Sequence, residues 1–149
     1  MTDHDDGLAR FVAAQDRAGT YEHALAELRR GRKQSHWIWY VFPQLDGLGH
    51  SDMSRHYALS SLAEARDYLA HPVLGPRLEE ASRALLGVQG HSIQEILGPI
   101  DAQKVHSSMT LFLRAGPMDA PYQQVLDVYF GGEPDAGTER LLAARPHGG

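Results

Sequence analysis

Cysteine is absent from this chain of 149 residues. Its absence excludes disulfides and thiolate nucleophiles, and a zinc site would have to use only histidine and carboxylate ligands. Nine histidines are present, but no two of them form a His-x-His or His-x-x-x-His pair, and the two closest are His50 and His56. We therefore expect neither a metal site nor another cofactor.

Long apolar runs are missing as well. The longest run spans residues 37–42, six residues against the roughly 20 that a membrane-spanning helix needs. The first seven residues are acidic where a signal peptide would be basic, and no apolar stretch follows them. These absences predict a cytoplasmic protein that does not enter a membrane.

An excess of positive charge is also lacking, since the formal net charge is −5 and the sequence pI is about 5.9. Nucleic-acid binders normally carry a basic surface that neutralises phosphates, so the balance argues against that class. Four basic residues still lie within five positions, which is sufficient for one anionic, phosphate-bearing small molecule: Arg29, Arg30, Arg32 and Lys33. The composition leaves the oligomeric state open.

Alternating apolar and polar residues, the pattern of a half-buried strand, are almost absent. Apolar residues instead recur at spacings of three and four, which predicts an all-α protein of eight or nine short helices in one domain over residues 1–149. An orthogonal bundle or an α-α superhelix would suit this pattern. We expect mobile termini at 1–6 and 146–149, and helices near 8–15, 20–31, 35–42, 61–69, 74–86, 92–98, 101–112, 122–130 and 135–144.

Several of these boundaries have capping signals. Two capping boxes pair Ser61 with Glu64 and Ser92 with Glu95, and Gly31 suits a left-handed position after a helix. Other N-caps are expected at Thr20, Ser35, Asp101 and Asp135.

The segment 31–44 is the most unusual part of the chain, because basic residues and His36 stand beside its only two tryptophans. Trp37, Tyr40 and Val41 fit one helical face, whereas Trp37, Trp39 and Val41 fit one face of a strand. Periodicity does not decide between them. The helical pattern of the neighbouring segments favours a helix.

Ordered sequence blocks cover nearly the whole chain: Lys33–Gln44, Gly47–Ser51, Tyr57–Ala65, Tyr68–Pro72, Asp101–Lys104, Ser107–Phe112, Val125–Phe130 and 135–142. Together these blocks resemble the DUF1810 family of bacterial proteins. The resemblance implies a small, mostly helical single-domain protein and specifies no reaction. Some members carry the label calpastatin, but calpastatin itself is a disordered inhibitor, and a globular composition with capped helices does not fit it.

A second pattern consists of Ser54-x-x-Tyr57, residues 64–66 and a late glycine-rich turn before residues 141–142. It resembles the NADAR (YbiA-like) helical hydrolases, which act on N-glycosidic bonds of ADP-ribose-type or ribosylated compounds. That family has an acidic residue soon after its serine, where this chain has Arg55 and His56. Its catalytic glutamate therefore has no counterpart here, and the similarity is one of analogy.

The first group of candidate site residues lies in the tryptophan segment. Lys33 and Ser35 could bind a ligand anion at a helix start, His36 could act as an acid or base, and Trp37 or Trp39 could stack on a base or sugar. The alternative is packing, with both rings in the core, the imidazole on a backbone carbonyl and the basic residues on a solvated face.

The second group lies in the helix expected from Asp101, where Asp101, Lys104 and Ser108 share one face. Asp101 could be a general base, Lys104 a donor to a phosphate or oxyanion, and Ser108 a ligand-orienting hydroxyl, with Ser107 as a further ligand-binding candidate. In the alternative, Asp101 caps the helix and pairs with Lys104, and the small serines allow close packing.

A third, weaker signal is the loop 47–51, where Gly-x-Gly could admit a phosphate and Ser51 or Ser54 could add a hydroxyl. The loop lacks the third glycine and the preceding strand of a nucleotide-binding fingerprint, so a simple turn is the alternative.

Two functions remain open. One is a hydrolase or transferase acting on a phosphorylated, ADP-ribose-like or nucleotide-like small molecule, with Asp101 and His36 as acid and base and Lys33 and Lys104 as anion holders. The other is a non-catalytic helical module that binds a metabolite or a protein partner. A cleft shared by residues 33–37 and 101–108 would favour the enzyme, whereas buried tryptophans and a purely capping Asp101 would not.

Overall fold

A computed structural model describes residues 3–118 and 120–145 of the chain. Within these ranges the protein is all-α, as predicted, and its one β-type pairing is an isolated bridge between Leu45 and Leu59. The helices are α1 Asp3–Asp16, η1 Arg17–Gly19, α2 Thr20–Arg30, α3 Ile38–Val41, α4 Asp52–His56, α5 Leu62–Ala70, α6 Leu74–Leu86, α7 Ile93–Leu97, α8 Pro99–Ala115, α9 Tyr122–Tyr129 and α10 Ala136–Ala143. All nine predicted helices are present, and α4 is an addition in a segment where the sequence predicted a loop.

Local capping sets many of these boundaries. The box at α7 is complete, because the Ser92 hydroxyl accepts from the Glu95 amide and the Glu95 carboxylate accepts from the Ser92 amide. Asp135 caps α10 by accepting from the Thr138 amide at 2.9 Å. Gly31 ends α2 at φ 75°, a left-handed conformation that favours glycine. These three predictions are confirmed.

Three predicted N-caps are wrong. Helix α2 is capped by Gly19 instead of Thr20, because the chain between α1 and α2 bends through left-handed backbone there. Helix α8 begins at Pro99, after Gly98, so Asp101 is its third residue and does not cap it. Ser35 precedes α3 by three residues, and its side chain is bonded elsewhere.

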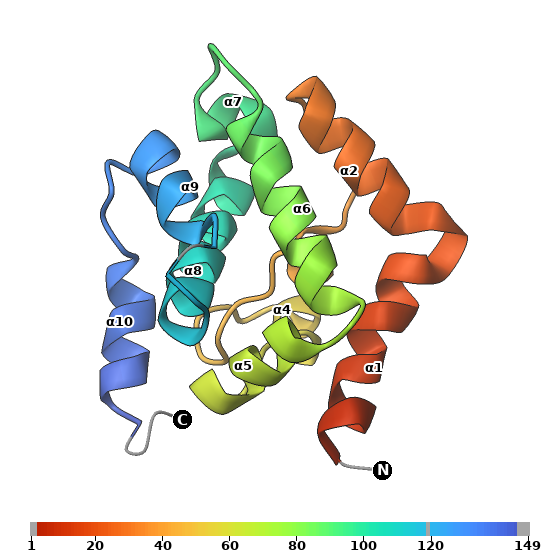
Figure 1. The fold of residues 1–149 in the computed structure, drawn as a ribbon, viewed down its shortest axis with the longest axis vertical. Coiled ribbons are helices and arrows are strands. Elements are labelled where there is room, and N and C mark those ends of the chain that lie inside the picture. The colour runs from red at the N-terminus through yellow and green to blue at the C-terminus, as the bar shows by residue number, and fades with distance from the viewer. Residues whose placement is uncertain (1–2, 119, 146–149) are drawn as a thin grey trace.

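One hydrophobic core joins the helices. Helix α6 lies between α1 and α2 on one side and α8 and α9 on the other (Figure 1), and α8 packs against α5, α7, α9 and α10. Each of these two long helices buries an apolar stripe with helical spacing. The stripes are Leu74, Leu78, Ala81 and Leu85 in α6, and Ala102, Val105, Met109 and Phe112 in α8.

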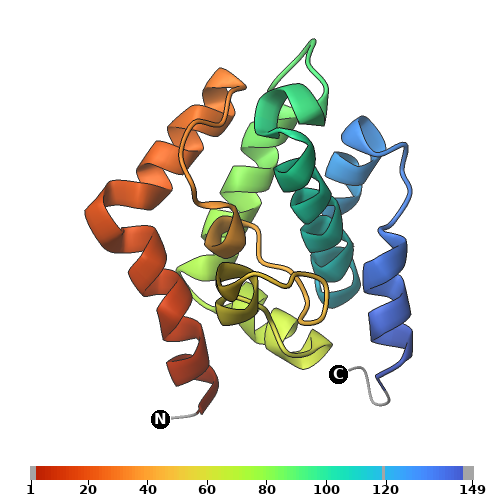
Figure 2. The ribbon, with the colours of Figure 1, turned by 180° about the vertical axis from the view of Figure 1, so that it is seen from behind.

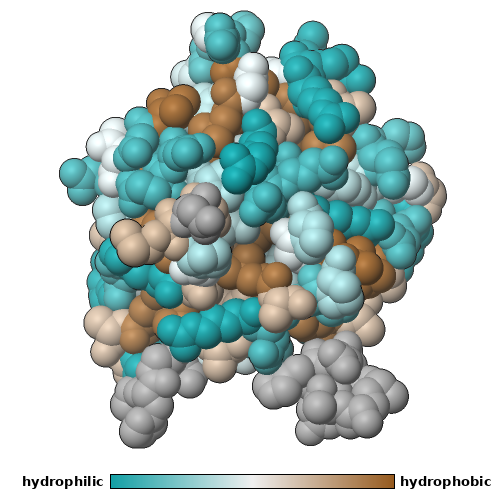
Figure 3. Space-filling model, in the orientation of Figure 1, coloured by the Kyte–Doolittle hydropathy of each residue, from teal (hydrophilic) through white to brown (hydrophobic). Residues whose placement is uncertain are grey.

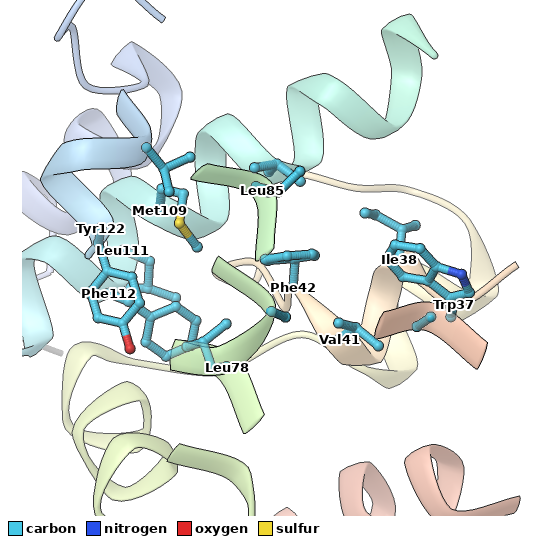
Figure 4. Packing of buried hydrophobic residues seen from close by; sticks show 14 of the residues in the cluster. Trp37, Ile38, Val41, Phe42, Leu78, Leu85, Met109, Leu111, Phe112 and Tyr122 are labelled. Atoms are coloured by element: carbon cyan, nitrogen blue, oxygen red, sulfur yellow. The ribbon is translucent and has the colours of Figure 1, made fainter. Parts of the chain in front are cut away.

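The tryptophan segment is neither a continuous helix nor a strand. Only Ile38–Val41 is helical, and the chain on both sides of this single turn is irregular where it crosses the face seen in Figure 2. Trp37 and Phe42 flank the turn and are fully buried, in the same packed layer as Leu85 and Met109 (Figure 4). The prediction of a helix over 35–42 is therefore correct only for its centre.

Of the termini expected to be mobile, residues 1–2 and 146–149 lie outside the described residues, and residues 3–6 belong to α1. None of the helices described is long and apolar enough to span a membrane.

Candidate functional site

A buried carboxylate organises the loop between α2 and α3. Glu27 is 4% exposed and accepts backbone N–H bonds from Gln34 at 2.7 Å and Ser35 at 2.9 Å. It also accepts from the Ser35 hydroxyl and from the Trp37 indole Nε1 at 2.9 Å. These donors lie on three residues of one irregular segment, so Glu27 supplies the order that regular backbone hydrogen bonding would supply elsewhere.

The same contacts set the ionisation of Glu27. Burial alone would raise the pKa of this carboxyl, but the hydrogen bonds from Ser35, Gln34 and Trp37 together outweigh burial and lower the pKa to about 2. Glu27 is therefore an anion at neutral pH, and its negative charge lies under the loop that carries Lys33 and His36.

Lys33 joins this loop to α8. Its backbone amide donates to the Ile96 carbonyl at 2.8 Å, and its ammonium lies 2.8 Å from the Asp101 carboxylate. The ammonium also donates to the Ser35 carbonyl and lies 5.1 Å from the centre of the Trp37 ring. Since the Lys33 side chain is only 8% exposed, these contacts leave little of its charge for a ligand.

Asp101 is thus committed to Lys33 instead of Lys104. The i,i+3 ion pair considered from the sequence does not form, because α8 directs Asp101 at the α2–α3 loop. Among the residues described, Lys104 has no side-chain partner and is half-buried. The two candidate groups meet through one ion pair, from Lys33 to Asp101.

A hollow of about 320 Å³ opens beside this ion pair, and we call it the His36 hollow. Its lining residues come from the loop, the end of α7 and the first turn of α8: Lys33, His36, Leu97, Gly98, Pro99, Ile100 and Asp101. His36 is exposed, and Ile100, at the start of α8, is 72% exposed. The hollow therefore combines apolar surface, one imidazole and a neutralised ion pair.

The two tryptophans differ. Trp37 has no exposed surface, with its ring in the core and its N–H on Glu27, so the packing alternative describes it well. Trp39 is partly buried and packs on the outside of the core. Neither ring lines the His36 hollow. Ser35 is likewise committed to Glu27.

The two serines of α8 lie away from the His36 hollow. Ser107 is buried, and its hydroxyl lies 3.2 Å from the Gln103 carbonyl and 3.3 Å from the Asp135 carboxylate. The Ser108 hydroxyl is fully buried and has no hydrogen-bond partner among the described residues. Neither serine lines the His36 hollow.

Ser51 and Ser54 form a cap of α4. The Ser51 hydroxyl accepts from the Ser54 amide at 3.1 Å and lies 3.0 Å from its hydroxyl. A Cβ at Gly49 would approach the Ser54 side chain to 2.4 Å, so the loop is folded closely on the cap. The geometry matches the simple turn, and the ligand-binding role of these serines stays a prediction.

Sequence reasoning missed Glu27 and Ile100. The signal for Glu27 was an acidic residue among Ala24, Leu25 and Leu28, on the face of α2 that is otherwise apolar. An acidic residue at a core position needs buried donors. Ile100 gave no comparable signal. In the part of the chain that the structure describes, no group of three or more histidine, aspartate and glutamate side chains could hold a metal ion.

Together, the fold and the site define a helical protein with one core and a small open hollow where the α2–α3 loop, α7 and α8 meet. The chain belongs to the DUF1810 family, described as proteins of unknown function, whose pattern it matches over residues 5–142. This result confirms the family resemblance stated from the sequence.

A solved structure supports the same fold. The chain is 50% identical to the conserved hypothetical protein Rv1873 from Mycobacterium tuberculosis, with a TM-score of 0.88 to its crystal structure. The match covers 93% of this chain and 97% of that protein. Comparison with curated proteins gave no significant match.

Proposed function

We propose that the protein is a non-catalytic module that binds a small anionic molecule in the His36 hollow. The observation that carries the proposal is the ion pair of Asp101 with Lys33 at 2.8 Å. Because the pair occupies the candidate base, His36 is the one ionisable group of this lining left without a side-chain partner in the described chain.

The remaining lining suits recognition. Leu97, Pro99 and Ile100 offer apolar surface to the body of a ligand. The amides of Ile100 and Asp101 lie in the first turn of a 17-residue helix, where backbone N–H groups have no partner within the helix. With His36, these amides provide donors for a negative group on the ligand.

A thermal-shift screen against nucleotides, ADP-ribose and sugar phosphates tests the proposal. A ligand present at about 100 times its Kd stabilises the folded state by about 2.7 kcal/mol, which raises Tm by about 5–10 °C in a domain of this size. The His36→Ala variant should lose most of that shift. The matched control is His23→Ala, which removes an exposed histidine of α2 and should keep it. If no compound in the set raises Tm, the proposal is wrong.

A hydrolase or transferase acting on such a phosphorylated or ADP-ribose-like compound is the second candidate. One observation favours it, since Lys33, His36 and Asp101 line the same hollow. Asp101 would then act as the base and His36 as the acid, with Lys33 holding Asp101 in position.

The two candidates separate by product formation. Each compound that raises Tm is incubated with the protein and followed by chromatography for hydrolysis or transfer. Turnover that disappears in Asp101→Asn, while the thermal shift remains, would establish the enzyme. Binding without turnover supports the binding module.

A further inference from the structure

A second hollow, of about 470 Å³, lies at the C-terminal end of α2, and we call it the Arg32 hollow. Its lining residues are Arg30, Gly31, Arg32, His91 and Glu95. Two guanidinium groups and an imidazole thus face one carboxylate. Figure 3 shows hydrophilic side chains over this end of α2.

The positive groups are available for a ligand. Both arginines are exposed; the Arg32 side chain makes no hydrogen bond or ion pair within the described residues, and Arg30 makes only a long hydrogen bond of 3.5 Å to Gln34. The carboxylate is already occupied, because Glu95 accepts from the Ser92 amide at 2.7 Å and lies 3.9 Å from His91 Nδ1. An anion in the hollow would meet unpaired donors on one side and a capped carboxylate on the other.

Gly31 holds the two sides of the Arg32 hollow close together. Its φ of 75° turns the chain after α2, and a Cβ there would approach Val88 Cγ1 to 3.0 Å and His91 Cδ2 to 3.9 Å. This close packing places the backbone of residues 30–32 against the segment between α6 and α7, beside His91.

The Arg32 hollow adjoins the His36 hollow along the same two segments. The hydrogen bond from the Lys33 amide to the Ile96 carbonyl lies between them. Arg32 and Glu95, each one residue before a member of this bond, line the Arg32 hollow. Lys33, which makes the bond, and Leu97, one residue after Ile96, line the His36 hollow. Neighbouring residues of both segments thus line the two hollows.

We propose that Arg30, Arg32 and His91 bind the phosphate group of a phosphorylated small molecule whose remaining part lies in the His36 hollow. The proposal rests on the function proposed above and specifies the ligand class. Arginine suits this role because its planar fork of N–H donors matches phosphate oxygens two at a time, which an ammonium cannot do. Lys33, committed to Asp101, is then a structural residue of the site.

Titration of the ¹⁵N-labelled protein with inorganic pyrophosphate at constant ionic strength tests the phosphate site. Amide shifts are expected at residues 30–33 and 91–95, and Arg32→Ala and Arg30→Ala should each weaken binding about tenfold, the usual effect of losing a charge-assisted hydrogen bond. Arg140→Ala is the matched control, because it removes an exposed arginine of α10, on the opposite side of the molecule, and should change nothing. The absence of shifts at millimolar pyrophosphate, or equal binding by Arg32→Ala and Arg140→Ala, would overturn the proposal.

A comparison of ADP with adenosine distinguishes this inference from the proposed function. If both bind equally through His36 and Arg32→Ala has no effect, the His36 hollow remains a binding site, but the phosphate site and the anionic ligand are refuted. If ADP binds no better than pyrophosphate and His36→Ala has no effect, while Arg32→Ala weakens both, the phosphate site is supported and the His36 hollow is refuted as the ligand's second contact.

Discussion

Two buried carboxylates organise polar clusters on opposite sides of the protein, Glu27 in α2 and Asp135 before α10 (Figure 1). Asp135 accepts from the Thr138 amide and hydroxyl at 2.9 and 2.7 Å and from Gln103 at 2.8 Å. These hydrogen bonds cap α10 and join it to α8. Glu27 instead holds an irregular loop whose outer side borders the two hollows. The comparison indicates that similar buried chemistry closes one side of the fold and, on the other, holds the loop that lines the two hollows where we propose binding.

Replacing Glu27 should have the largest effect. Glu27→Ala removes four hydrogen bonds and leaves the buried Trp37 N–H without an acceptor, so we expect a loss of about 3–5 kcal/mol in the free energy of unfolding. Urea denaturation measures it. Glu27→Gln keeps a carbonyl oxygen for most of these donors but loses the charge, and should lose about 2–3 kcal/mol. Glu22→Ala, an exposed change in the same helix, should stay within about 0.5 kcal/mol. A loss below about 1 kcal/mol in Glu27→Ala would contradict the role of Glu27.

The pH dependence of stability sharpens this prediction. The pKa of Glu27 is lowered from 4.5 to about 2 in the folded protein, so its contribution is present above pH 4.5 and is lost as the pH falls toward 2. The shift corresponds to about 3 kcal/mol. The stability difference between wild type and Glu27→Gln should therefore shrink between pH 5 and pH 2, followed by urea denaturation. A difference that stays constant would show that Glu27 acts by shape and not by charge.

The Asp135 cluster should be less sensitive. Burial would raise the pKa of Asp135, but hydrogen bonds from Thr138 and Gln103 outweigh burial and lower it. Asp135→Ala removes the cap of α10 and the Gln103 contact, for an expected loss of about 2–3 kcal/mol in thermal or urea unfolding. Asp135→Asn, also a good capping residue, should recover more than half of that loss. Binding at the two hollows should be unchanged in both variants, since α10 lies away from them.

The same comparison explains how far the sequence predicts the fold. Asp135 was predictable because a cap acts on the amide three residues later, and the stripes of α6 and α8 repeat at helical spacing. The structure of segment 31–44 was not predictable, because its backbone is held by the side chain of Glu27, which lies outside the segment in α2. The bonds from Glu27 reach seven, eight and ten residues ahead, and no periodic pattern records contacts of that kind.

The candidate site was predicted in part for a similar reason. The sequence placed Lys33, His36 and Asp101 in two candidate groups, and the fold brings these three to one hollow. It could not assign the partner of Asp101, since helical spacing favoured Lys104 and the actual partner lies 68 positions away in the chain. The sequence also could not show that the Trp37 ring is buried, because a ring packed in the core and a ring that stacks on a ligand have the same local sequence pattern.

The Lys33–Asp101 pair gives the smallest and most specific test of the contrast between the two regions. Its side chains are 8% and 20% exposed, whereas the Arg83–Glu79 pair of α6, at 3.6 Å, is about half exposed on both sides. A double-mutant cycle with Lys33→Met and Asp101→Asn should give a coupling energy of about 1–2 kcal/mol, because low exposure limits screening by solvent. The same cycle on Arg83 and Glu79 should give less than about 0.5 kcal/mol. Equal values would mean that Lys33 is as accessible as a surface lysine, in which case it could meet a ligand directly and the phosphate contact would not need Arg30 and Arg32.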